Sequence, residues 1–571
     1  MIVGIDLGTT NSLVAVWKDG QATLIPNSLG NVLTPSVVSV DGNGHILVGQ
    51  AARERLVTHP ELTAAAFKRF MGSQKTYTLG RKVFRPEELS SLVLGSLKAD
   101  AEVWLGEPVT EAVITVPAYF NDIQRNATRI AAELAGLKVR RLLNEPTAAA
   151  MAYGLHQAQG ESKFLVLDLG GGTFDVTLLD LFEGIMEVRA SAGDNCLGGE
   201  DFTAAIAEAF VQHATANLGE PAVFWEKQAA QVLAAAEQVK RNLSGVAGPV
   251  SVTMTVHAND RKYEWPLTEE HFLSLSKKLL ERIRTPIEKA LRDSRVRLSE
   301  LDEVVLVGGS TRMPILRKLV VQMFGRFPAT QLHPDEAIAL GAAVQAGLTA
   351  RDAALDEVVM TDVAPYSLGV DTSIRTGENE YAHGQFSPII ERNTVIPASK
   401  VQTYHPMHDT QKVVEFGIYQ GEARLVKDNI FLGKISLSVP PGKATEIGID
   451  VRFSYDANGV LEVDVINATT GERKVLVIQN DKSTLTPEQV EASLKKLEAL
   501  KIHPREQMEN RTLIARADRL FSQSLGQARE SVRHHLAVFE AVLDRQEPNE
   551  IRHAASSFKT YLDSIDVEIF H

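Results

Sequence analysis

Two aspartates in this chain occupy similar settings, each between an apolar run and a glycine-rich turn. Asp6 lies in "GIDLGTTNS" and Asp168 in "LDLGGGTFDVT". The flanking apolar and β-branched residues predict a strand, a tight turn and a second strand at both places. The glycines let the backbone approach a ligand, successive turn N–H groups bind an anion, and a carboxylate can hold a metal ion or its waters. We therefore predict that the two turns bind one polyphosphate from opposite sides.

A third glycine motif, "VLVGGSTRMP", ends on Arg312, whose guanidinium can stack on an aromatic base. Upstream, "AEQVKRNLS" places Glu237, Lys240, Arg241 and Ser244 on one helical face, with charges suited to a ribose and a base. Alone, this face would be interpreted as solvated surface. The chain contains neither GxxxxGK[ST] nor a GxGxxG motif that opens a helix. We therefore predict a nucleotide held by two hairpin turns and a metal ion.

The sequence pattern predicts an α/β part, an apolar linker, a β part and a helical part. Strands alternate with amphipathic helices up to about residue 355, and strict alternation of apolar residues begins after 362, as in Ile449, Val451 and Phe453. "TPEQ" at 486–489 predicts a helix start. The expected boundaries are 1–355, 356–362, 363–481 and 482–571.

The composition narrows the class of protein. The net charge of −13 disfavours nucleic acid and anionic membrane as partners. The single cysteine, Cys196, permits no internal disulfide and is expected to be a packed small residue rather than a nucleophile. The sequence shows no signal peptide and no apolar run long enough to span a bilayer, so we expect a cytoplasmic protein.

Seven segments together resemble the DnaK-type family of heat-shock chaperones, and most closely its divergent HscC-type branch. They are "GIDLGTTNS", "VITVPAYFNDIQRNAT", "NEPTAAAMAYGL", "DLGGGTFDVT", "LGGEDF", "VLVGGSTRMP" and "PDEAIALGAAVQAG". The resemblance covers essentially the whole chain, is weaker in the β part and is slight in the helices. It implies an ATPase domain of the actin/hexokinase type, a β-sandwich peptide-binding domain and a short α-helical lid.

The resemblance implies a site for ATP or ADP with Mg²⁺ and K⁺. Asp6 and Asp168 resemble the carboxylates that order the waters of Mg²⁺, and Asp175 resembles a K⁺ ligand. Lys68 and Glu145 resemble the pair that holds and orients the attacking water, although by itself Lys68 would be interpreted as a surface lysine. Thr173, which approaches the γ-phosphate, completes the implied catalytic set, and the implied nucleotide contacts are Gly8, Thr9, Thr10, Asn11, Gly170, Gly171, Gly172, Glu237, Lys240, Arg241, Ser244, Gly308, Gly309, Ser310, Arg312 and Asp335.

The resemblance also implies coupling between the two domains. "VVM" is too short and too close to acidic residues to be a core strand, and it resembles the hydrophobic linker that docks on the ATPase domain when ATP is bound. Pro117 and Arg125 resemble a proline switch and its relay arginine. The implied coupling residues are Pro117, Arg125, Val358, Val359 and Met360.

The β part resembles a cleft for an extended peptide. A pocket for one apolar side chain would be lined by Val370, Thr372, Val414, Phe416 and Val460. Ser373 and Met407 would arch over the peptide backbone, with Tyr404 beneath it. The alternative interpretation of the apolar members, as core of the β part, stays open at this point.

The function expected from the sequence is that of an ATP-dependent chaperone that binds extended apolar segments of unfolded proteins. A J-domain co-chaperone is its implied partner. The residues at 251–268 predict two strands joined by a tight turn at Asn259-Asp260. Longer members of the family that the chain resembles carry more residues here, in a loop associated with holding the cleft shut, so the resemblance implies rapid ADP release with an exchange factor dispensable. Two alternatives share the fold: a small-molecule kinase and an actin-like ATPase. Neither needs the linker and the β part.

Overall fold

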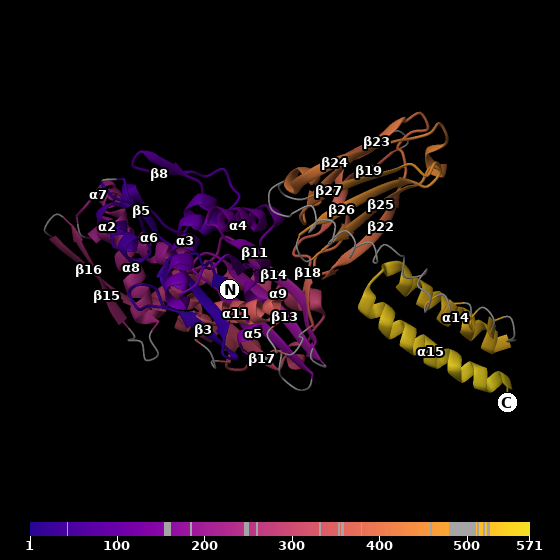
Figure 1. Cartoon of the computed structure of the whole chain (residues 1–571), viewed down its shortest axis with the longest axis horizontal. Coiled ribbons are helices and arrows are strands. Elements are labelled where there is room, and N and C mark those ends of the chain that lie inside the picture. Colours follow the sequence, from indigo (N-terminus) through magenta and orange to yellow (C-terminus); the bar gives the residue numbers. More distant parts are fainter. Residues whose placement is uncertain are drawn as a thin grey trace. The chain divides into compact units, whose positions relative to one another are not determined.

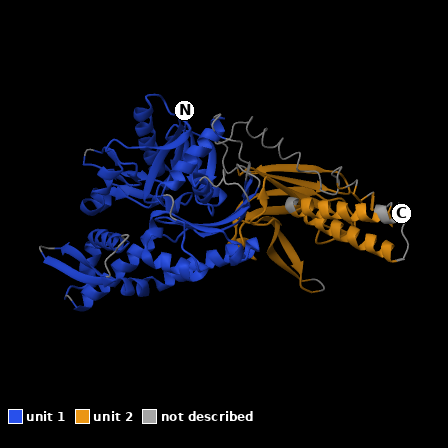
Figure 2. Ribbon diagram, turned by 90° about the horizontal axis from the view of Figure 1, so that it is seen from below, with its two compact units in different colours: residues 1–365 blue, residues 366–571 orange. Residues whose placement is uncertain are grey.

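The computed structural model divides the chain into two compact units, residues Met1–Pro365 and Tyr366–His571 (Figure 2). The structure describes residues 1–42, 44–153, 161–182, 185–217, 219–244, 251–258, 261–329, 333–351, 355, 359–377, 380–456, 459–478, 510, 513–514, 516–517, 520–521 and 526–570. Among the predicted features, Val358, the turn Asn259-Asp260 and the helix start at 486–489 lie outside these residues.

The first sheet of the first unit has the strand order β11-β10-β1-β2-β3, with β4 paired to β2. Its strands are β1 (Ile2–Asp6), β2 (Asn11–Lys18), β3 (Gln21–Ile25), β4 (Thr34–Pro35), β10 (Glu111–Val116) and β11 (Lys138–Asn144). β1 and β2 are antiparallel and joined by the turn after Asp6, whereas β10 runs parallel to β1. The predicted strand, turn and strand is therefore confirmed at Asp6.

The second sheet includes the order β17-β12-β13-β14-β18. Its strands are β12 (Ser162–Leu169), β13 (Phe174–Phe182), β14 (Ile185–Asp194), β17 (Glu303–Val307) and β18 (Val359–Val363). β12 and β13 are antiparallel, and the turn between them follows Asp168, so the second predicted hairpin is also confirmed. β17 runs parallel to β12, as β10 does to β1.

Each sheet has its own buried apolar core. We call each sheet, together with its core, a lobe of the first unit. The core of the first lobe (residues 1–153) includes Ile5, Val14 and Ile114, and the core of the second lobe (residues 161–329) includes Leu167 and Val176. The main helices of the unit are α3 (Pro86–Leu105), α4 (Asp122–Leu134), α5 (Glu145–Ala152), α6 (Gly199–Asn217), α7 (Ala222–Lys227), α8 (Ala229–Leu243), α9 (Glu269–Ser294), α10 (Pro314–Phe324) and α11 (Ala337–Ala350) (Figure 1).

The smaller elements of this unit are short helices and hairpins around the lobes. They are β5 (Val38–Val40), β6 (Ile46–Val48), β7 (Thr63–Ala64), β8 (Tyr77–Leu79), β9 (Lys82–Phe84), β15 (Ser251–Ala258), β16 (Arg261–Thr268), α1 (Gln50–Arg53), α2 (Arg55–Thr58), and the 3₁₀ helices η1 (Pro60–Leu62), η2 (Phe67–Phe70), η4 (Leu298–Glu300) and η5 (Gly309–Arg312). β15 and β16 pair antiparallel along their full length, which confirms the two predicted strands.

Helix α11 returns from the second lobe to pack on the first. It contacts α5, β1 and β2, and its sequence is rich in alanine and glycine. A Cβ atom at Gly4 would lie 2.3 Å from the backbone of Ala342, so only glycine permits this approach of helix and strand. Small side chains on both sides therefore place α11 directly over the strand that carries Asp6.

The second unit contains two antiparallel four-stranded sheets, with the orders β20-β19-β23-β24 and β22-β25-β26-β27. The strands are β19 (Leu368–Arg375), β20 (Tyr381–Ile390), β21 (Val395–Ile396), β22 (Ala398–Tyr404), β23 (Val413–Gln420), β24 (Ile430–Ser438), β25 (Ile449–Tyr455), β26 (Leu461–Asn467) and β27 (Arg473–Ile478), with 3₁₀ helices η6 (Val426–Asp428) and η7 (Ala444–Glu446). The sheets contact each other through β24 with β27 and β20 with β22.

The predicted alternation in this unit is confirmed by burial. Ile449, Val451 and Phe453 are completely buried on one face of β25, and Leu461 and Val463 are buried on the paired strand β26. Two helices follow, α14 (Gly526–Arg545) and α15 (Pro548–Phe570), which pack side by side with Phe539 and Phe558 stacked between them (Figure 1). Across the part of the chain that the structure describes, none of the helices combines the length and apolar character needed to cross a membrane.

Two predictions from the sequence are wrong. Cys196 is exposed rather than packed, because it lies in the loop between β14 and α6. The linker was predicted to be too short for a core strand, yet Val359–Val363 forms β18, which joins the second sheet parallel to β14 with Val359 opposite Ile185. Pairing with an existing strand supplies the hydrogen bonds that so short a segment cannot make alone.

Candidate active site

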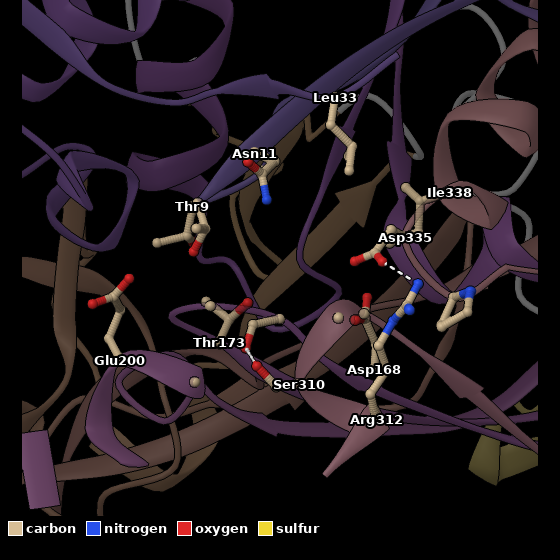
Figure 3. A pocket seen from close by; sticks show the side chains of 18 of the residues that line it. Thr9, Asn11, Leu33, Asp168, Thr173, Glu200, Ser310, Arg312, Asp335 and Ile338 are labelled. Atoms are coloured by element: carbon tan, nitrogen blue, oxygen red, sulfur yellow. Dashed lines mark hydrogen bonds and ion pairs between the residues drawn. The ribbon is translucent and has the colours of Figure 1, made fainter. Parts of the chain in front are cut away.

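A cavity of about 540 Å³ lies in the first unit and is lined by residues of both lobes. Both glycine turns reach it, as does the loop after β17 that carries Ser310 and Arg312. Figure 3 shows Thr9 and Asn11 of the first turn facing Thr173 and Ser310. Residues that are distant in sequence thus converge on one space.

The two glycine turns touch each other at the cavity. A Cβ atom at Gly171 would lie 1.9 Å from Oγ1 of Thr10, so a larger residue cannot stand there. The carbonyl of Gly170 accepts hydrogen bonds from the backbone N–H of Gly199, at 3.0 Å, and from the hydroxyl of Ser310, at 2.8 Å. The second turn is therefore fixed to the start of α6 and to the loop after β17.

A buried ion pair lines part of the cavity. Nζ of Lys68 is 2.7 Å from Oε1 of Glu145, and the two residues are only 3% and 5% exposed. Lys68 lies on the 3₁₀ turn η2, and Glu145 is the first residue of α5, directly after β11. The sequence alone would place Lys68 on the surface; its position in η2 instead turns it inward to the carboxylates.

Three buried aspartates surround this pair, and burial raises the pKa of each. Desolvation and the charge of Glu145 raise the pKa of Asp6 to about 7 and that of Asp175 to about 8. The same causes raise the pKa of Asp168 well above its ordinary value. Lys68 opposes the shift in all three cases. The site thus concentrates more negative charge than its lysine compensates.

These carboxylates fit a cation held by oxygen. Oδ2 of Asp168 and Oδ2 of Asp175 are buried and have no hydrogen-bond partner among the described residues. Carboxylate oxygens and water are the ligands that Mg²⁺ prefers. Among the described residues, no group of three or more His, Cys, Asp or Glu side chains is placed to hold a metal ion together.

Helix α8 also contributes side chains to the lining of the cavity. Nζ of Lys240 bonds to Glu237 Oε2 at 2.6 Å, to Thr203 Oγ1 at 2.9 Å and to the carbonyl of Gly199 at 2.8 Å. Burial alone would raise the pKa of Glu237. The charge of Lys240 and the hydrogen bonds that Glu237 accepts from Lys240 and Thr203 nevertheless lower this pKa overall. Arg241 bonds to the same glutamate at 3.0 Å. A polar face is therefore fixed in place where the sequence predicted one.

The loop after β17 also brings Arg312 to the cavity. Its Nη2 lies 2.6 Å from Oδ2 of Asp335, as Figure 3 shows, and 2.5 Å from Nε2 of His333. A Cβ atom at Gly309 would lie 2.5 Å from Oδ1 of Asp335, so the glycine allows the acid to approach the loop. Arg312 is thereby held by two partners from the segment before α11.

The cavity brings together nearly all the predicted nucleotide and catalytic residues. Those lining it are Asp6, Gly8, Thr9, Thr10, Asn11, Lys68, Glu145, Asp168, Gly170, Gly171, Thr173, Glu237, Lys240, Arg241, Ser244, Gly308, Gly309, Ser310, Arg312 and Asp335. Two predicted residues lie behind this surface: Gly172 packs on Thr9 and Arg69, and Asp175 accepts a hydrogen bond from the backbone of Tyr119.

Sequence reasoning missed several lining residues. They are Leu13, Leu33, Gly199, Glu200, Met313, His333, Pro334 and Ile338. Glu200 belongs to "LGGEDF", and Pro334 and Ile338 belong to "PDEAIALG", so the motif signal was present without a role for these members. Burial raises the pKa of Glu200, which faces the cavity in Figure 3.

One side chain, that of Asn144, connects β18 to the predicted coupling residue Arg125. Asp362 of β18 accepts a hydrogen bond of 2.6 Å from Nδ2 of Asn144, whose Oδ1 accepts one of 2.6 Å from Arg125. Arg125 also donates to the carbonyls of Ala118 and Phe120, beside Pro117. Asn144 immediately precedes Glu145, and the sequence analysis assigned no role to Asn144 or Asp362.

In the second unit the residues of the predicted peptide pocket lie close to the interior. Val370, Val414, Phe416 and Val460 are at most 8% exposed. The ring of Tyr404 lies 5.5 Å from that of Phe416, and its hydroxyl is 3.0 Å from that of Ser387. The remaining predicted members, on β19 and after β22, are partly exposed: Thr372, Ser373 and Met407.

Tyr381 and His383 connect the two predicted arch residues. The hydroxyl of Ser373 lies 2.9 Å from Nδ1 of His383, which stacks on Tyr381. Tyr381 in turn donates to the carbonyl of Met407 at 3.3 Å.

The comparison with known families agrees with this geometry. The family model described as Hsp70 protein matches residues 2–570, nearly the full length of the 571-residue chain. The match spans both units, the cavity and the two C-terminal helices. It does not distinguish between branches of the family. The chain belongs to the Hsp70 family.

Proposed function

We propose that this chain is an ATP-dependent chaperone whose first unit hydrolyses ATP in the cavity described above. Members of the Hsp70 family are ATPases that bind ATP or ADP with Mg²⁺, act on unfolded polypeptides and work with J-domain co-chaperones. The observation that carries the proposal is the convergence of two touching glycine turns on the buried Lys68–Glu145 pair. We further propose that it acts in the cytoplasm, as a member of the HscC-type branch.

In this proposal the glycine turns bind the phosphates through backbone N–H groups and the hydroxyls of Thr9 and Thr10. Lys68 holds the attacking water, and Glu145 accepts a hydrogen bond from that water and orients it. Asp6 and Asp168 would hold Mg²⁺ through its waters, and Asp175 would contribute to a K⁺ site. The metal, when bound, neutralises charge on the phosphates. Phosphoryl transfer needs mainly positioning and charge compensation, which these groups supply.

The adenosine would bind between α8 and the loop after β17. The carboxylate of Glu237 suits the ribose hydroxyls, and the guanidinium groups of Arg241 and Arg312 suit the faces of the base. Ser244 and Asp335 border the same region. Supporting this assignment, Lys240 and Glu237 are already fixed by hydrogen bonds, so little side-chain freedom would be lost on binding.

The second unit would bind an extended apolar peptide at the residues named from the sequence, with Tyr404 beneath it and Ser373 and Met407 above it. We propose that the state of the nucleotide reaches this unit through β18, Pro117 and Arg125. Support comes from the hydrogen bonds that join Asp362 to Asn144 and Asn144 to Arg125. The two bonds meet at Asn144, the residue before Glu145.

ATP turnover with and without an extended apolar peptide tests the proposal directly. We expect slow hydrolysis that the peptide accelerates several-fold. A charged peptide of equal length serves as the control and should leave the rate unchanged. Hydrolysis that no apolar peptide stimulates, together with phosphate transfer to a small-molecule acceptor, would favour a kinase, and ATP-dependent sedimentation would favour a filament protein.

A further inference from the structure

The two residues predicted to arch over a bound peptide come from different segments of the second unit. Ser373 lies on β19, whereas Met407 lies between β22 and β23, and both are partly exposed. β19 and β22 belong to different sheets. Because the hydrogen bonds of a sheet join only its own strands, the two sides of this arch need other contacts to hold them together.

A β-bulge in the pairing of β19 with β20 brings His383 to the first side of the arch. Between two regular pairs of this ladder, Ser373 alone stands opposite two residues, His383 and Gly384. Gly384 has a φ of 69°, a left-handed conformation that suits glycine. A bulge of this kind redirects the neighbouring side chain. The hydroxyl of Ser373 accordingly lies 2.9 Å from Nδ1 of His383.

Tyr381 reaches from this side of the arch to the other. It is the first residue of β20, and its ring stacks on that of His383 with 6.5 Å between the ring centroids. Its hydroxyl donates to the carbonyl of Met407 at 3.3 Å, and its ring meets that of His408 edge to face at 5.5 Å. The contacts of Tyr381 therefore run from Ser373, through His383, to the segment that carries Met407.

That segment is itself held in place by other hydrogen bonds. The backbone N–H of Met407 donates to Oε1 of Gln411 at 2.8 Å. Oδ1 of Asp409 accepts a hydrogen bond of 2.7 Å from the backbone N–H of Ala444. Tyr381 thus bonds to a carbonyl whose position other contacts determine, so its hydroxyl can hold the two sides of the arch together.

We propose that Tyr381 is a positioning residue of the peptide cleft, which holds the arch closed and thereby slows both the entry and the release of peptide. The inference rests on the proposed function, since it needs a peptide beneath Ser373 and Met407. A closed arch obstructs movement in both directions. Loss of a contact made only in the closed arch raises the population of the open arch, through which peptide enters and leaves.

This role has a kinetic signature that damage to the cleft lacks. If Tyr381 only supported the local fold, its removal would leave a distorted cleft that releases peptide faster but binds it no faster. If Tyr381 holds the arch closed, its removal accelerates association and release together. The dissociation constant then changes less than either rate.

The test measures the association and release rates of a fluorescein-labelled extended peptide with a central leucine, on the full chain with ADP. Tyr381→Phe removes the hydroxyl and keeps the ring against the two histidines, whereas Tyr381→Ala removes both. We expect both rates to rise about two- to tenfold in Tyr381→Phe, the range for one neutral hydrogen bond. They should rise further in Tyr381→Ala, which also loses the ring contacts.

Tyr419→Ala is the matched control. Tyr419 lies on β23 of the same sheet, and its ring packs against that of Phe431 on β24 with 5.4 Å between the centroids. This variant therefore loses an aromatic contact of similar size within the sheet. It should associate with the peptide and release it at the rates of the unmodified protein.

Unchanged rates in both Tyr381 variants would overturn the inference. Faster release without faster association would do the same, as would equal acceleration by Tyr419→Ala. If the unmodified protein binds no apolar peptide, the function proposed for the second unit fails, and the inference with it. The two failures are distinguishable, because the first leaves peptide binding by the unmodified protein intact.

Discussion

At the scale of single residues, the Lys68–Glu145 pair is costly to maintain, because two charges are removed from water. A pair retained under that cost, beside three further carboxylates, suits chemistry better than stability. We predict that Lys68→Ala lowers the single-turnover rate of ATP hydrolysis about 10²-fold or more, as losses of preorganised electrostatic groups do. ATP affinity should change little, since the glycine turns remain.

The matched control for this prediction is Lys75→Ala. Lys75 follows the same 3₁₀ turn and lies over the rings of Phe70 and Tyr77, but does not line the cavity. Its hydrolysis rate should equal that of the unmodified protein. Hydrolysis by Lys68→Ala at a near-normal rate, with ATP bound, would contradict the assignment of Lys68.

The raised pKa of Asp175 predicts how stability without bound cations depends on pH. Its pKa is about 8 in the folded protein against 3.8 ordinarily, so the folded state binds a proton that the unfolded state releases. This contribution is complete below about pH 4 and is lost as the pH rises through 8. We predict that Asp175→Asn, which cannot lose a proton, avoids this decline of about 2–5 kcal/mol between pH 5 and pH 9.

Urea unfolding in buffers free of Mg²⁺ and K⁺ would measure this difference at several pH values. Asp6, whose pKa is also raised, is present in both proteins, so its effect cancels. The two stability curves should diverge as the pH rises, and added Mg²⁺ and K⁺ should reduce the divergence. Parallel curves would show that Asp175 is not protonated preferentially in the folded state.

The sequence predicted residues of the site well where one motif carries several of them, as in "DLGTTN" and "GGSTR". It failed for residues whose role depends on neighbours from distant segments. His333 is one such residue, because its contact with Arg312 joins segments on opposite sides of α10. The prediction for Cys196 failed for a local reason: composition favours burial of cysteine, but a loop position between β14 and α6 exposes it.

At the scale of elements, alternation of apolar residues was enough to predict β25 and β26, because each strand buries one face. The same rule failed for β18, whose few apolar residues show no alternation and whose partner, β14, lies far away in sequence. Strand pairing of this kind is decided by tertiary context rather than by local preference.

The position of β18 leads to a prediction about coupling. Asp362 holds the side chain of Asn144, which also binds Arg125. We predict that Asp362→Ala leaves basal ATP hydrolysis within about threefold but slows ATP-triggered peptide release at least about fivefold, the cost of about one hydrogen bond to a charged group. Stopped-flow release of a fluorescent peptide measures this directly.

The control is Asp41→Ala, which removes a partly exposed carboxylate that contacts His45 and does not line the cavity. It should release peptide as the unmodified protein does. If Asp362→Ala also shows normal ATP-triggered release, β18 holds the chain in place without transmitting the state of the nucleotide.

At the scale of the whole molecule, the family match covers both units, whereas the cavity proposed to bind nucleotide belongs entirely to the first. If nucleotide binds in this cavity, we expect its release to require separation of the two lobes that line it. Arg69 connects them: it lies on η2 of the first lobe and bonds to Asp201 of α6, at 3.1 Å, and to the carbonyl of Cys196, at 2.8 Å. The rate of ADP release should therefore depend on this arginine.

Arg282 provides a closely matched comparison. It bonds to the same carbonyl of Cys196, at 3.2 Å, and to Asp194 at 2.7 Å, but it lies on α9, so all three residues belong to the second lobe. We predict that Arg69→Ala speeds ADP release about three- to tenfold, since a partly exposed ion pair contributes about 1 kcal/mol and the carbonyl contact adds to it. Arg282→Ala should leave the rate unchanged. Stopped-flow release of a fluorescent ADP measures both, and equal rates in the two variants would show that lobe opening does not depend on the contacts of Arg69.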